Sequence, residues 1–298
     1  MNSIFDFHAD DYALSGCSDD DILSLCRDGL LDSISILPNL SIFDSAVQKF
    51  LSQKRNFPRT IAVSVHLNVM EGKCCAQKDL LPDLVDANGF FIVSWGKLFA
   101  YSYAPIYRRK IREQLKLEII AQIERCISAG ICSKENIRID SHQHPHMIPV
   151  FFSALSDAVS ELERMGCSFS YIRISQDPLS FYNGENFFSL NIIKCLILNF
   201  YSIKVKRYLK QKELPQNYLC GVYYSGRMDG RIAAVLPVFE KKANACGKTV
   251  EVLFHPGMMH SNELTDEFTK KGFNEFHLSS CRKIEFDTVR GLKNDYQQ

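Results

Sequence analysis

Short segments in which every second residue is apolar recur along the chain, and helical segments lie between them. The clearest is TIAVSVHLNV (60–69), in which every odd-numbered residue from Ile61 to Val69 is aliphatic and every even-numbered one is small or polar. A period of two is typical of a β-strand with one buried face. Further strands are predicted at residues 3–7, 136–142, 169–175 and 248–257, and amphipathic helices at residues 107–127 and 151–166. This alternation predicts an α/β protein with a largely parallel, barrel-like sheet.

The chain is expected to form one domain. No linker rich in glycine, serine or proline divides residues 1–298. Residues 176–226 interrupt the alternation, because they hold an apolar helix that runs into a basic one (191–212). Two interpretations of this segment stay open with equal weight, an inserted cap over the barrel mouth and an ordinary surface helix. The polar chain from about residue 283 is expected to be exposed.

Charge and cysteine content limit the class of protein. The net charge of +1 gives no electrostatic reason to expect a nucleic-acid partner. The 11 cysteines are odd in number and form no CxxC pair, so we expect reduced, mostly buried thiols and a cytoplasmic location. No apolar run reaches the roughly 20 residues of a transmembrane helix, so no transmembrane segment is expected.

The segment IDSHQHPHMIP (139–149) concentrates metal-binding side chains. Asp140, His142, His144 and His146 lie within seven positions, although the whole chain has only 8 histidines. The segment follows a predicted strand and precedes a predicted helix, so it is expected to form a strand-to-helix turn. Histidines on a turn are more often structural than metal-binding, and this cluster needs support from other residues.

Polar side chains also end the other predicted strands. They are Asp10 and Asp11 after the first strand, His66 in the second, Arg173 in the fourth and His255 in the last. The carboxyl ends of the strands of an α/β barrel meet at one mouth, where catalytic groups collect. One carboxylate with two imidazoles suits a divalent metal, a second carboxylate can act as a base, and a separate histidine can act as an acid. Each residue alone has an ordinary structural explanation, but their joint occurrence favours a hydrolytic metal site.

Five motifs in order resemble the YdjC-like carbohydrate deacetylases, the family of chitooligosaccharide deacetylase. HADDYALS resembles the family's NADDFGLS, and VSVHLNVMEGK resembles its GLHL followed by T-x-G. IDSHQHPHMIPVF is similar to LDSHQHVHLLP almost letter for letter. YIRIS lies where the family has a short arginine-containing strand, and EVLFHPG resembles E-x-x-x-HPG. The motifs span residues 4–257, and the third is the most specific.

The resemblance implies an irregular (β/α) barrel related to the NodB-type polysaccharide deacetylases. It implies hydrolysis of the acetamido group of an amino-sugar-containing saccharide, with release of acetate. Carried over by position, Asp11, His66 and His142 hold one divalent metal ion, Asp10 is the base and His255 is the acid. The family uses magnesium or zinc, and two imidazoles make zinc as plausible as magnesium. Family resemblance also makes a homodimer reasonable.

Other motif positions are carried over less directly. Arg173 positions Asp10 or the substrate, and His144 and His146 support the metal ligands or contact the substrate. Two positions depart from the family pattern: His8 stands in place of asparagine and Ala13 in place of glycine. His8 adds a ligand or a titrating group near the metal, and the turn after Asp11 is expected to differ in shape, because alanine resists backbone angles that glycine allows. These departures bear on substrate choice more than on catalysis.

Three alternatives stay open. The site also suits another metal-dependent hydrolase, such as a phosphoesterase. A non-catalytic saccharide-binding protein on the same scaffold is a further possibility, although all the chemical groups for catalysis are present. The helical segment 194–212 has an apolar front and a basic end, which would suit a lipid-linked or anionic saccharide near a membrane surface. A lid helix over the site is the simpler explanation of that segment.

Overall fold

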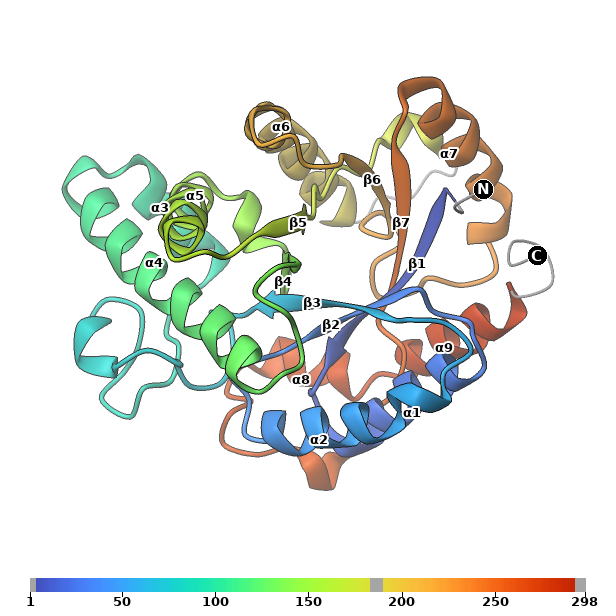
Figure 1. Cartoon of the computed structure of the whole chain (residues 1–298), viewed down its shortest axis with the longest axis horizontal. Helices are drawn as coiled ribbons and strands as arrows, with labels where there is room; N and C mark the ends of the chain where they lie inside the picture. Colours follow the sequence, from blue (N-terminus) through green and yellow to red (C-terminus); the bar gives the residue numbers. More distant parts are fainter. Residues whose placement is uncertain (1–3, 183–189, 293–298) are drawn as a thin grey trace.

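Seven parallel strands form one curled sheet in the computed structural model, which describes residues 4–182 and 190–292 (Figure 1). The order across the sheet is β5-β4-β3-β2-β1-β7-β6. The strands are β1 (Phe5–Tyr12), β2 (Ser33–Ile36), β3 (Ala62–Leu67), β4 (Ile137–Ser141), β5 (Phe169–Ile172), β6 (Asn217–Cys220) and β7 (Thr249–Phe254). The predicted α/β class with an irregular, barrel-like parallel sheet is confirmed.

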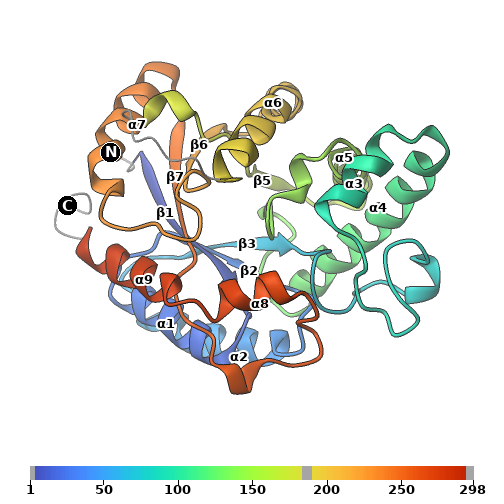
Figure 2. The same ribbon diagram turned by 180° about the vertical axis from the view of Figure 1, so that it is seen from behind.

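Helices surround the curled sheet and leave its carboxyl-terminal mouth accessible. They are α1 (Gly16–Arg27), α2 (Phe43–Gln53), α3 (Trp95–Tyr103), α4 (Pro105–Ser128), α5 (Pro149–Arg164), α6 (Leu190–Gln211), α7 (Ile232–Cys246), α8 (Lys271–His277) and α9 (Cys281–Gly291). Figures 1 and 2 show α1, α2 and α9 along one side of the sheet and α3, α4 and α5 along another. Among the described residues, no helix combines the length and apolarity that a membrane crossing requires.

The apolar core lies between the sheet and these helices. In α4 the four-residue repeat Ile111, Leu115, Ile119 and Ile123 is buried, as its period predicts. Each such side chain contributes roughly 1.5–3 kcal/mol when it is removed from water. Tyr107 begins the same repeat but is 52% exposed, so the buried face starts one turn later. The apolar core therefore packs against the outer face of the sheet. Other side chains fill the inside of the curl.

The inside of the curl is polar. Along β1, Phe5 and Phe7 join the apolar core, whereas His8 points inward to the serines of β2. His8 Nδ1 lies 2.6 Å from Ser33 Oγ, and His8 Nε2 lies 2.7 Å from Ser35 Oγ. All three side chains are buried, so these hydrogen bonds offset the cost of removing polar groups from water. This polar interior also explains why the alternating segment 60–69 carries His66 on its inner face.

The curl stays open between β5 and β6, which do not pair as strands. A few hydrogen bonds bridge the gap: the backbone N–H of Leu219 donates to the carbonyl of Gln176 (2.8 Å), and the Asn217 side chain both accepts from Ile174 N (3.2 Å) and donates to Ile174 O (3.4 Å). The chain between these residues carries α6. The barrel is therefore closed at this edge by individual contacts, not by a ladder.

Several sequence-based expectations were wrong. The first strand does not end at residue 7, because His8–Tyr12 continues β1. β2 and β6 have only four residues each and were not predicted. The chain after residue 283 is not simply exposed, because Glu285 and Val289 of α9 are buried. The single domain over residues 1–298 with an insertion at 176–226 stays a prediction, and residues 1–3, 183–189 and 293–298 lie outside the described residues.

Candidate functional site

The adjacent carboxylates of Asp10 and Asp11 lie at the carboxyl end of β1. Successive strand residues normally point to opposite faces, but Asp11 has a left-handed backbone with φ 67°, and the pairing of β1 with β2 shifts register between Ala9 and Tyr12. The irregularity lets both buried carboxylates enter the same mouth, where Asp10 meets Arg173 and Asp11 meets His142. The turn after Asp11 also contains Ala13 at φ 69°, a conformation that glycine adopts more easily.

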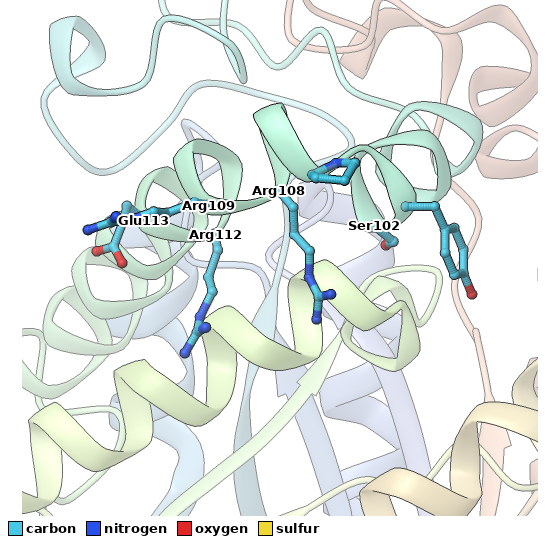
Figure 3. Close-up of a pocket in the computed structure, with 7 residues that line it drawn as sticks. Ser102, Arg108, Arg109, Arg112 and Glu113 are labelled. Carbon is cyan, nitrogen blue, oxygen red and sulfur yellow. The ribbon is translucent and has the colours of Figure 1, made fainter.

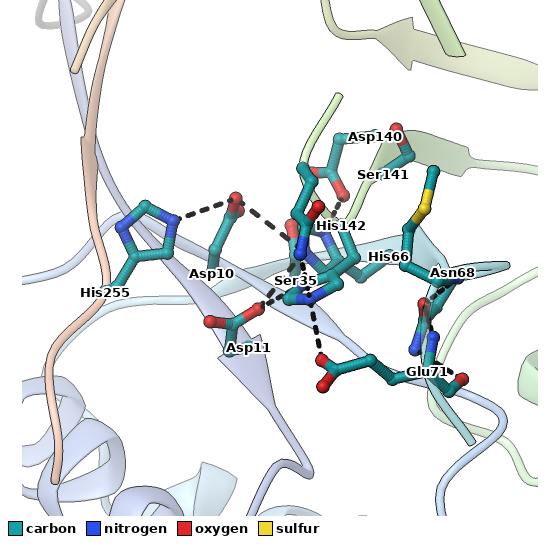
Figure 4. Close-up of polar contacts among 12 residues, drawn as sticks. Asp10, Asp11, Ser35, His66, Asn68, Glu71, Asp140, Ser141, His142 and His255 are labelled. Atoms are coloured by element: carbon teal, nitrogen blue, oxygen red, sulfur yellow. Dashed lines mark hydrogen bonds and ion pairs between the residues drawn. The ribbon is translucent and has the colours of Figure 1, made fainter. Parts of the chain in front are cut away.

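Asp11, His66 and His142 form a compact set of donor atoms (Figure 4). Asp11 Oδ1 lies 2.9 Å from His142 Nδ1 and 3.4 Å from His66 Nε2. One donor atom from each residue lies within 4.8 Å of the others. His66 Nε2 is buried and has no hydrogen-bond partner in the described chain, so it is free to bind a cation. One carboxylate and two imidazoles at this spacing fit a divalent metal ion.

His66 and His142 each contact a second carboxylate on the side of the ring that faces away from Asp11. Asp140 Oδ1 lies 2.6 Å from His66 Nδ1, and Glu71 Oε2 lies 3.1 Å from His142 Nε2. In each histidine, the ring nitrogen that faces away from Asp11 can donate its proton in a hydrogen bond to the neighbouring carboxylate. The other ring nitrogen, which faces Asp11, then carries no proton. The two histidines would thus carry their protons on opposite nitrogens. Carboxylates of this kind orient the ligands of a metal site.

The charge balance of the set favours a cation. Burial opposes protonation of His66, but the charges of Asp10 and Asp140 outweigh it and raise the pKa of His66 to about 10. Burial likewise opposes protonation of His142, but Asp11 and Glu71 raise its pKa to about 9. Negative charge therefore exceeds positive charge around these imidazoles, and a metal ion can replace the protons that they attract.

Asp10 is held by a fully buried arginine. Arg173 donates from Nη1 to Asp10 Oδ2 (3.0 Å) and from Nη2 to Asp10 Oδ1 (2.8 Å), and His8 Nε2 lies 3.0 Å from Asp10 Oδ1. Burial alone would raise the pKa of Asp10, but Arg173, His66 and His8 hold it well below its ordinary value. Arg173 also contacts Asp140 and Glu251. The guanidinium thus fixes the position and the ionised state of Asp10.

His255 follows β7 and approaches Asp10 from the side away from His66 (Figure 4). Its Nε2 lies 3.9 Å from Asp10 Oδ2. Glu285 of α9 accepts a hydrogen bond from the His255 backbone N–H (2.5 Å), and its carboxylate lies 3.5 Å from His255 Nδ1. The His255 side chain is 14% exposed, in contrast to the buried His66. His255 is therefore the ring best placed to meet a molecule that enters the mouth.

His144 and His146 occupy different positions. His144 lines the pocket described below, and its Nδ1 lies 3.0 Å from Ser175 Oγ. His146 does not line that pocket, because its ring is held between Ser141 Oγ and the carbonyl of Arg173. Burial, together with the charge of Arg173, lowers the pKa of His146 to about 4, so the ring is neutral. His146 therefore supports the loop around Arg173, and His144 faces the ligand space.

A cavity of about 190 Å³ opens over these groups. Its lining residues come from the strand ends and from α6 and α8: Asp11, His142, Gln143, His144, Lys194, Ser225, Gly226, His255, Phe273, Phe276 and His277. The volume is smaller than the roughly 300 Å³ at which drug-sized pockets begin. It suits a small polar group at one end of a larger molecule.

Sequence reasoning missed several residues of the site. Arg282 of α9 donates from Nη1 to Asp11 Oδ2 (2.9 Å), and His277 Nε2 lies 3.0 Å from Glu71 Oε2. Glu71 lies in a segment without periodicity, and Lys194 lies in the helix that interrupts the alternation. In α9 the buried residues Arg282 and Glu285 are three positions apart, but their burial cannot be inferred from a segment so rich in charge, so no signal in the sequence pointed to them.

Comparisons with known proteins identify the family of the chain. The family described as YdjC-like protein matches residues 6–292. A chitooligosaccharide deacetylase of Escherichia fergusonii is 27% identical over 161 residues, which cover 54% of this chain and 57% of that protein. A carbohydrate deacetylase of Brevibacillus brevis is 27% identical over 183 residues, which cover 60% of this chain and 66% of that protein. The chain thus spans about half to two thirds of the length of these relatives.

A solved structure supports the fold. A proposed cellobiose-phosphate cleavage protein from Enterococcus faecalis superimposes with a TM-score of 0.55 at 17% identity, and the match covers 96% of this chain and 94% of that one. At this identity the likeness concerns the fold alone. The family match covers nearly the whole chain and includes every strand that carries the site. The chain therefore belongs to the family of YdjC-like proteins.

Proposed function

We propose that the protein is a metal-dependent hydrolase that removes the N-acetyl group from an amino-sugar-containing saccharide and releases acetate. The observation that carries the proposal is that two adjacent carboxylates have different neighbours. Asp11 faces two imidazoles, one of which has a bare, buried nitrogen, while Asp10 is clamped by Arg173 and faces His255. The names of the curated relatives, chitooligosaccharide deacetylase and carbohydrate deacetylase, support the substrate class.

Asp11, His66 and His142 would hold the metal. A divalent ion there would supply Lewis-acid activation of the amide carbonyl and of a water molecule. The donor set of one oxygen and two nitrogens fits zinc, and magnesium also if water completes its coordination. Asp140 and Glu71 would keep both imidazoles neutral and oriented when the metal is bound, because each accepts the remote N–H.

The remaining groups would move protons. Asp10 accepts a proton from the attacking water, and Arg173 holds the carboxylate at the angle that this transfer requires. Water adds to the amide carbon, the C–N bond breaks, and His255 donates a proton to the departing nitrogen. The products are acetate and a free amino sugar. The position of His255, across Asp10 from the proposed metal ligands, supports this order of transfers.

The first test does not depend on the identity of the sugar. Divalent-metal stoichiometry, measured by elemental analysis and titration, is compared between the wild type, His142→Ala and the control His260→Ala, whose side chain is exposed and outside the site. We expect one metal per chain in the wild type and the control, and weak or no binding in a folded His142→Ala. If the reloaded wild type binds no metal, the proposal is wrong.

The second test follows acetate release from a panel of N-acetylated saccharides. We expect turnover by the wild type and a loss of at least about 100-fold in Asp10→Asn, since a positioned general base contributes about 10²–10⁴-fold. Phosphatase activity that His142→Ala abolishes, without acetate release from any sugar, would favour a phosphoesterase. Tight sugar binding without any product would favour a binding protein.

We also infer a cytoplasmic location, supported by the finding that the eleven cysteines are all free thiols. A homodimer stays a prediction and is tested by sedimentation of the full chain.

A further inference from the structure

The outward face of α6 carries a stripe of large apolar side chains. Ile193, Leu196, Phe200 and Ile203 are 56%, 57%, 66% and 58% exposed. Their spacing of three and four residues places them in one line along the helix. Scattered exposed apolar residues are ordinary, but a contiguous line of them marks an interaction site.

A second exposed apolar group lies beside this stripe, where α3 passes into α4. Tyr103, Ile106 and Tyr107 are 67%, 87% and 52% exposed. The hydroxyls of Tyr103 and Tyr201 of α6 are hydrogen-bonded, and the rings of Phe99 and Tyr201 lie 5.8 Å apart. The α6 stripe and the α3–α4 junction therefore form one surface, which we call the α6–α4 surface.

Positive charge is concentrated on the same surface. Helix α6 contains no acidic residue and five basic ones, of which Lys194 lines the candidate catalytic cavity and not the outward face: Lys194, Lys204, Lys206, Arg207 and Lys210. The exposed residues Arg207 and Lys210 continue the line of the apolar stripe toward the end of the helix. Because the whole chain has a net charge of only +1, this concentration is local. The stripe is thus apolar in its first half and basic in its second.

The start of α4 adds an arginine-lined cavity of about 600 Å³ (Figure 3). Arg108, Arg109 and Arg112 line it, with Glu113 as its single acidic residue. Burial, together with the charges of Arg108 and Arg112, lowers the pKa of the neighbouring Lys204. The cations therefore crowd one another here, although Asp157 pairs with Arg112, and an external anion would relieve the crowding.

We propose that the α6–α4 surface docks the protein on an anionic phospholipid bilayer. The apolar half of the stripe, with Ile106, would enter the boundary between headgroups and acyl chains, while the arginines and lysines contact lipid phosphates. The docked face adjoins the candidate catalytic cavity, because Lys194 of α6 lines that cavity. The proposal is independent of the proposed deacetylase activity.

A second copy of the chain fits this surface less well. A parallel pairing of two α6 helices would place Arg207 and Lys210 against their own counterparts, and like charges repel. An antiparallel pairing would place these two cations against Ile193 and Leu196 of the other copy. The parallel arrangement matches the apolar halves but sets like charges together, and the antiparallel arrangement with full overlap sets cations against apolar side chains, so the charge pattern favours a lipid surface.

Vesicle co-sedimentation of the full chain tests the proposal. Phosphatidylcholine vesicles are compared with vesicles that also contain phosphatidylglycerol, at low and at high salt. We expect binding to the anionic vesicles that salt weakens. Arg108→Glu with Arg109→Glu should bind at least about tenfold more weakly, because a basic residue near an anionic surface contributes about 1 kcal/mol. Leu196→Ser with Phe200→Ser should also bind at least about tenfold more weakly, because two apolar side chains are removed from the boundary between headgroups and acyl chains.

Matched controls are Lys241→Glu with Lys242→Glu on α7, and Met165→Ser, all exposed and distant in sequence from the surface. They should bind vesicles like the wild type. Equal sedimentation with and without anionic vesicles, or undiminished binding by both surface variants, would overturn the proposal. A wild-type dimer that both surface variants dissociate, without vesicle binding, would assign the surface to a second copy and also overturn it.

Discussion

At the scale of single residues, the carboxylates behind the two histidines determine which nitrogens are available. Glu71 contacts His142 Nε2 and also His277, and burial that would raise the pKa of Glu71 is outweighed by these two histidines, which lower it to about 2. Glu71 is therefore a carboxylate acceptor. The nitrogen of His142 that faces Asp11 is then free of its proton when a metal binds.

The variant Glu71→Gln tests this arrangement. We expect metal affinity to fall by about 10–100-fold, the usual effect of losing an outer carboxylate, because the amide attracts the imidazole N–H less strongly. Isothermal titration with zinc and with magnesium measures the change. Glu113→Gln, at a largely exposed position on α4, is the control. Unchanged affinity in Glu71→Gln would show that His142 is oriented without Glu71.

Ala13 is strained, and we expect Ala13→Gly to stabilise the protein. Its φ of 69° lies in the left-handed region, which costs a residue with a side chain roughly 1–2 kcal/mol. Glycine removes that strain but loses about 0.5–1 kcal/mol through the greater entropy of the unfolded chain. The net gain in the free energy of unfolding is about 0.5–1 kcal/mol. Urea denaturation measures it, and a loss of stability would show that the buried methyl group matters more.

At the scale of elements, α4 anchors a segment that has little structure of its own. Glu118 accepts backbone hydrogen bonds from Cys75 and Ala76, and Gln122 donates to the same carboxylate (2.7 Å). Burial is the largest influence and raises the pKa of Glu118 to about 7, although these hydrogen bonds oppose it. The chain that follows Glu71 is therefore attached to α4 through a buried carboxyl group.

This attachment predicts a pH dependence of stability. Folded Glu118 binds its proton more tightly than the unfolded chain does, so the free energy of unfolding falls as the pH rises from about 4.5 to about 7. The fall is on the order of 3 kcal/mol at most. Glu118→Gln should remove this part of the slope in urea denaturation across that range, whereas Glu124→Gln, exposed on the same helix, should not. Parallel slopes in all three proteins would contradict the pKa shift.

At the scale of the whole molecule, the last helix completes a site that the first strand begins. Arg282 of α9 is fully buried, pairs with Asp11 and donates from Nε to the carbonyl of Gly257 (2.6 Å). The two ends of the sequence are thus joined by one buried ion pair. Loss of one partner of such a pair typically costs about 3–5 kcal/mol, because the other charge is left buried.

Arg282→Met is therefore expected to lower the melting temperature strongly, and a divalent metal should restore part of the loss. The metal supplies the positive charge that Asp11 has lost, so its stabilising effect should be larger in the variant than in the wild type. Thermal unfolding with and without metal measures both effects. Lys283→Met, an exposed neighbour, should behave like the wild type. Equal metal stabilisation in both proteins would show that Arg282 and the metal do not share Asp11.

The sequence was informative where a general rule of topology applied. Parallel strands present their carboxyl ends at one mouth, so strand-end residues could be grouped before any coordinates: Asp10, Asp11, His66, His142, Arg173 and His255. The structure brings these six together, while their roles stay proposals. Glu71 and Arg282 could not be grouped, because they come from a loop and from a terminal helix whose positions depend on tertiary packing. β2 was missed because four residues give too short a period to recognise.

The gap between β5 and β6 has a consequence for how this scaffold diversifies. The bonds that bridge the gap join Ile174, Gln176 and Asp177 on one side to Asn217, Leu219, Gly221 and Tyr223 on the other, and α6 adds bonds to both sides through Asn199 and Asn191. Insertions, deletions or a transplanted helix between these anchors would leave every strand ladder intact. The segment can therefore vary in length and change the cavity wall that Lys194 now provides, without displacing the carboxylates and histidines at the strand ends.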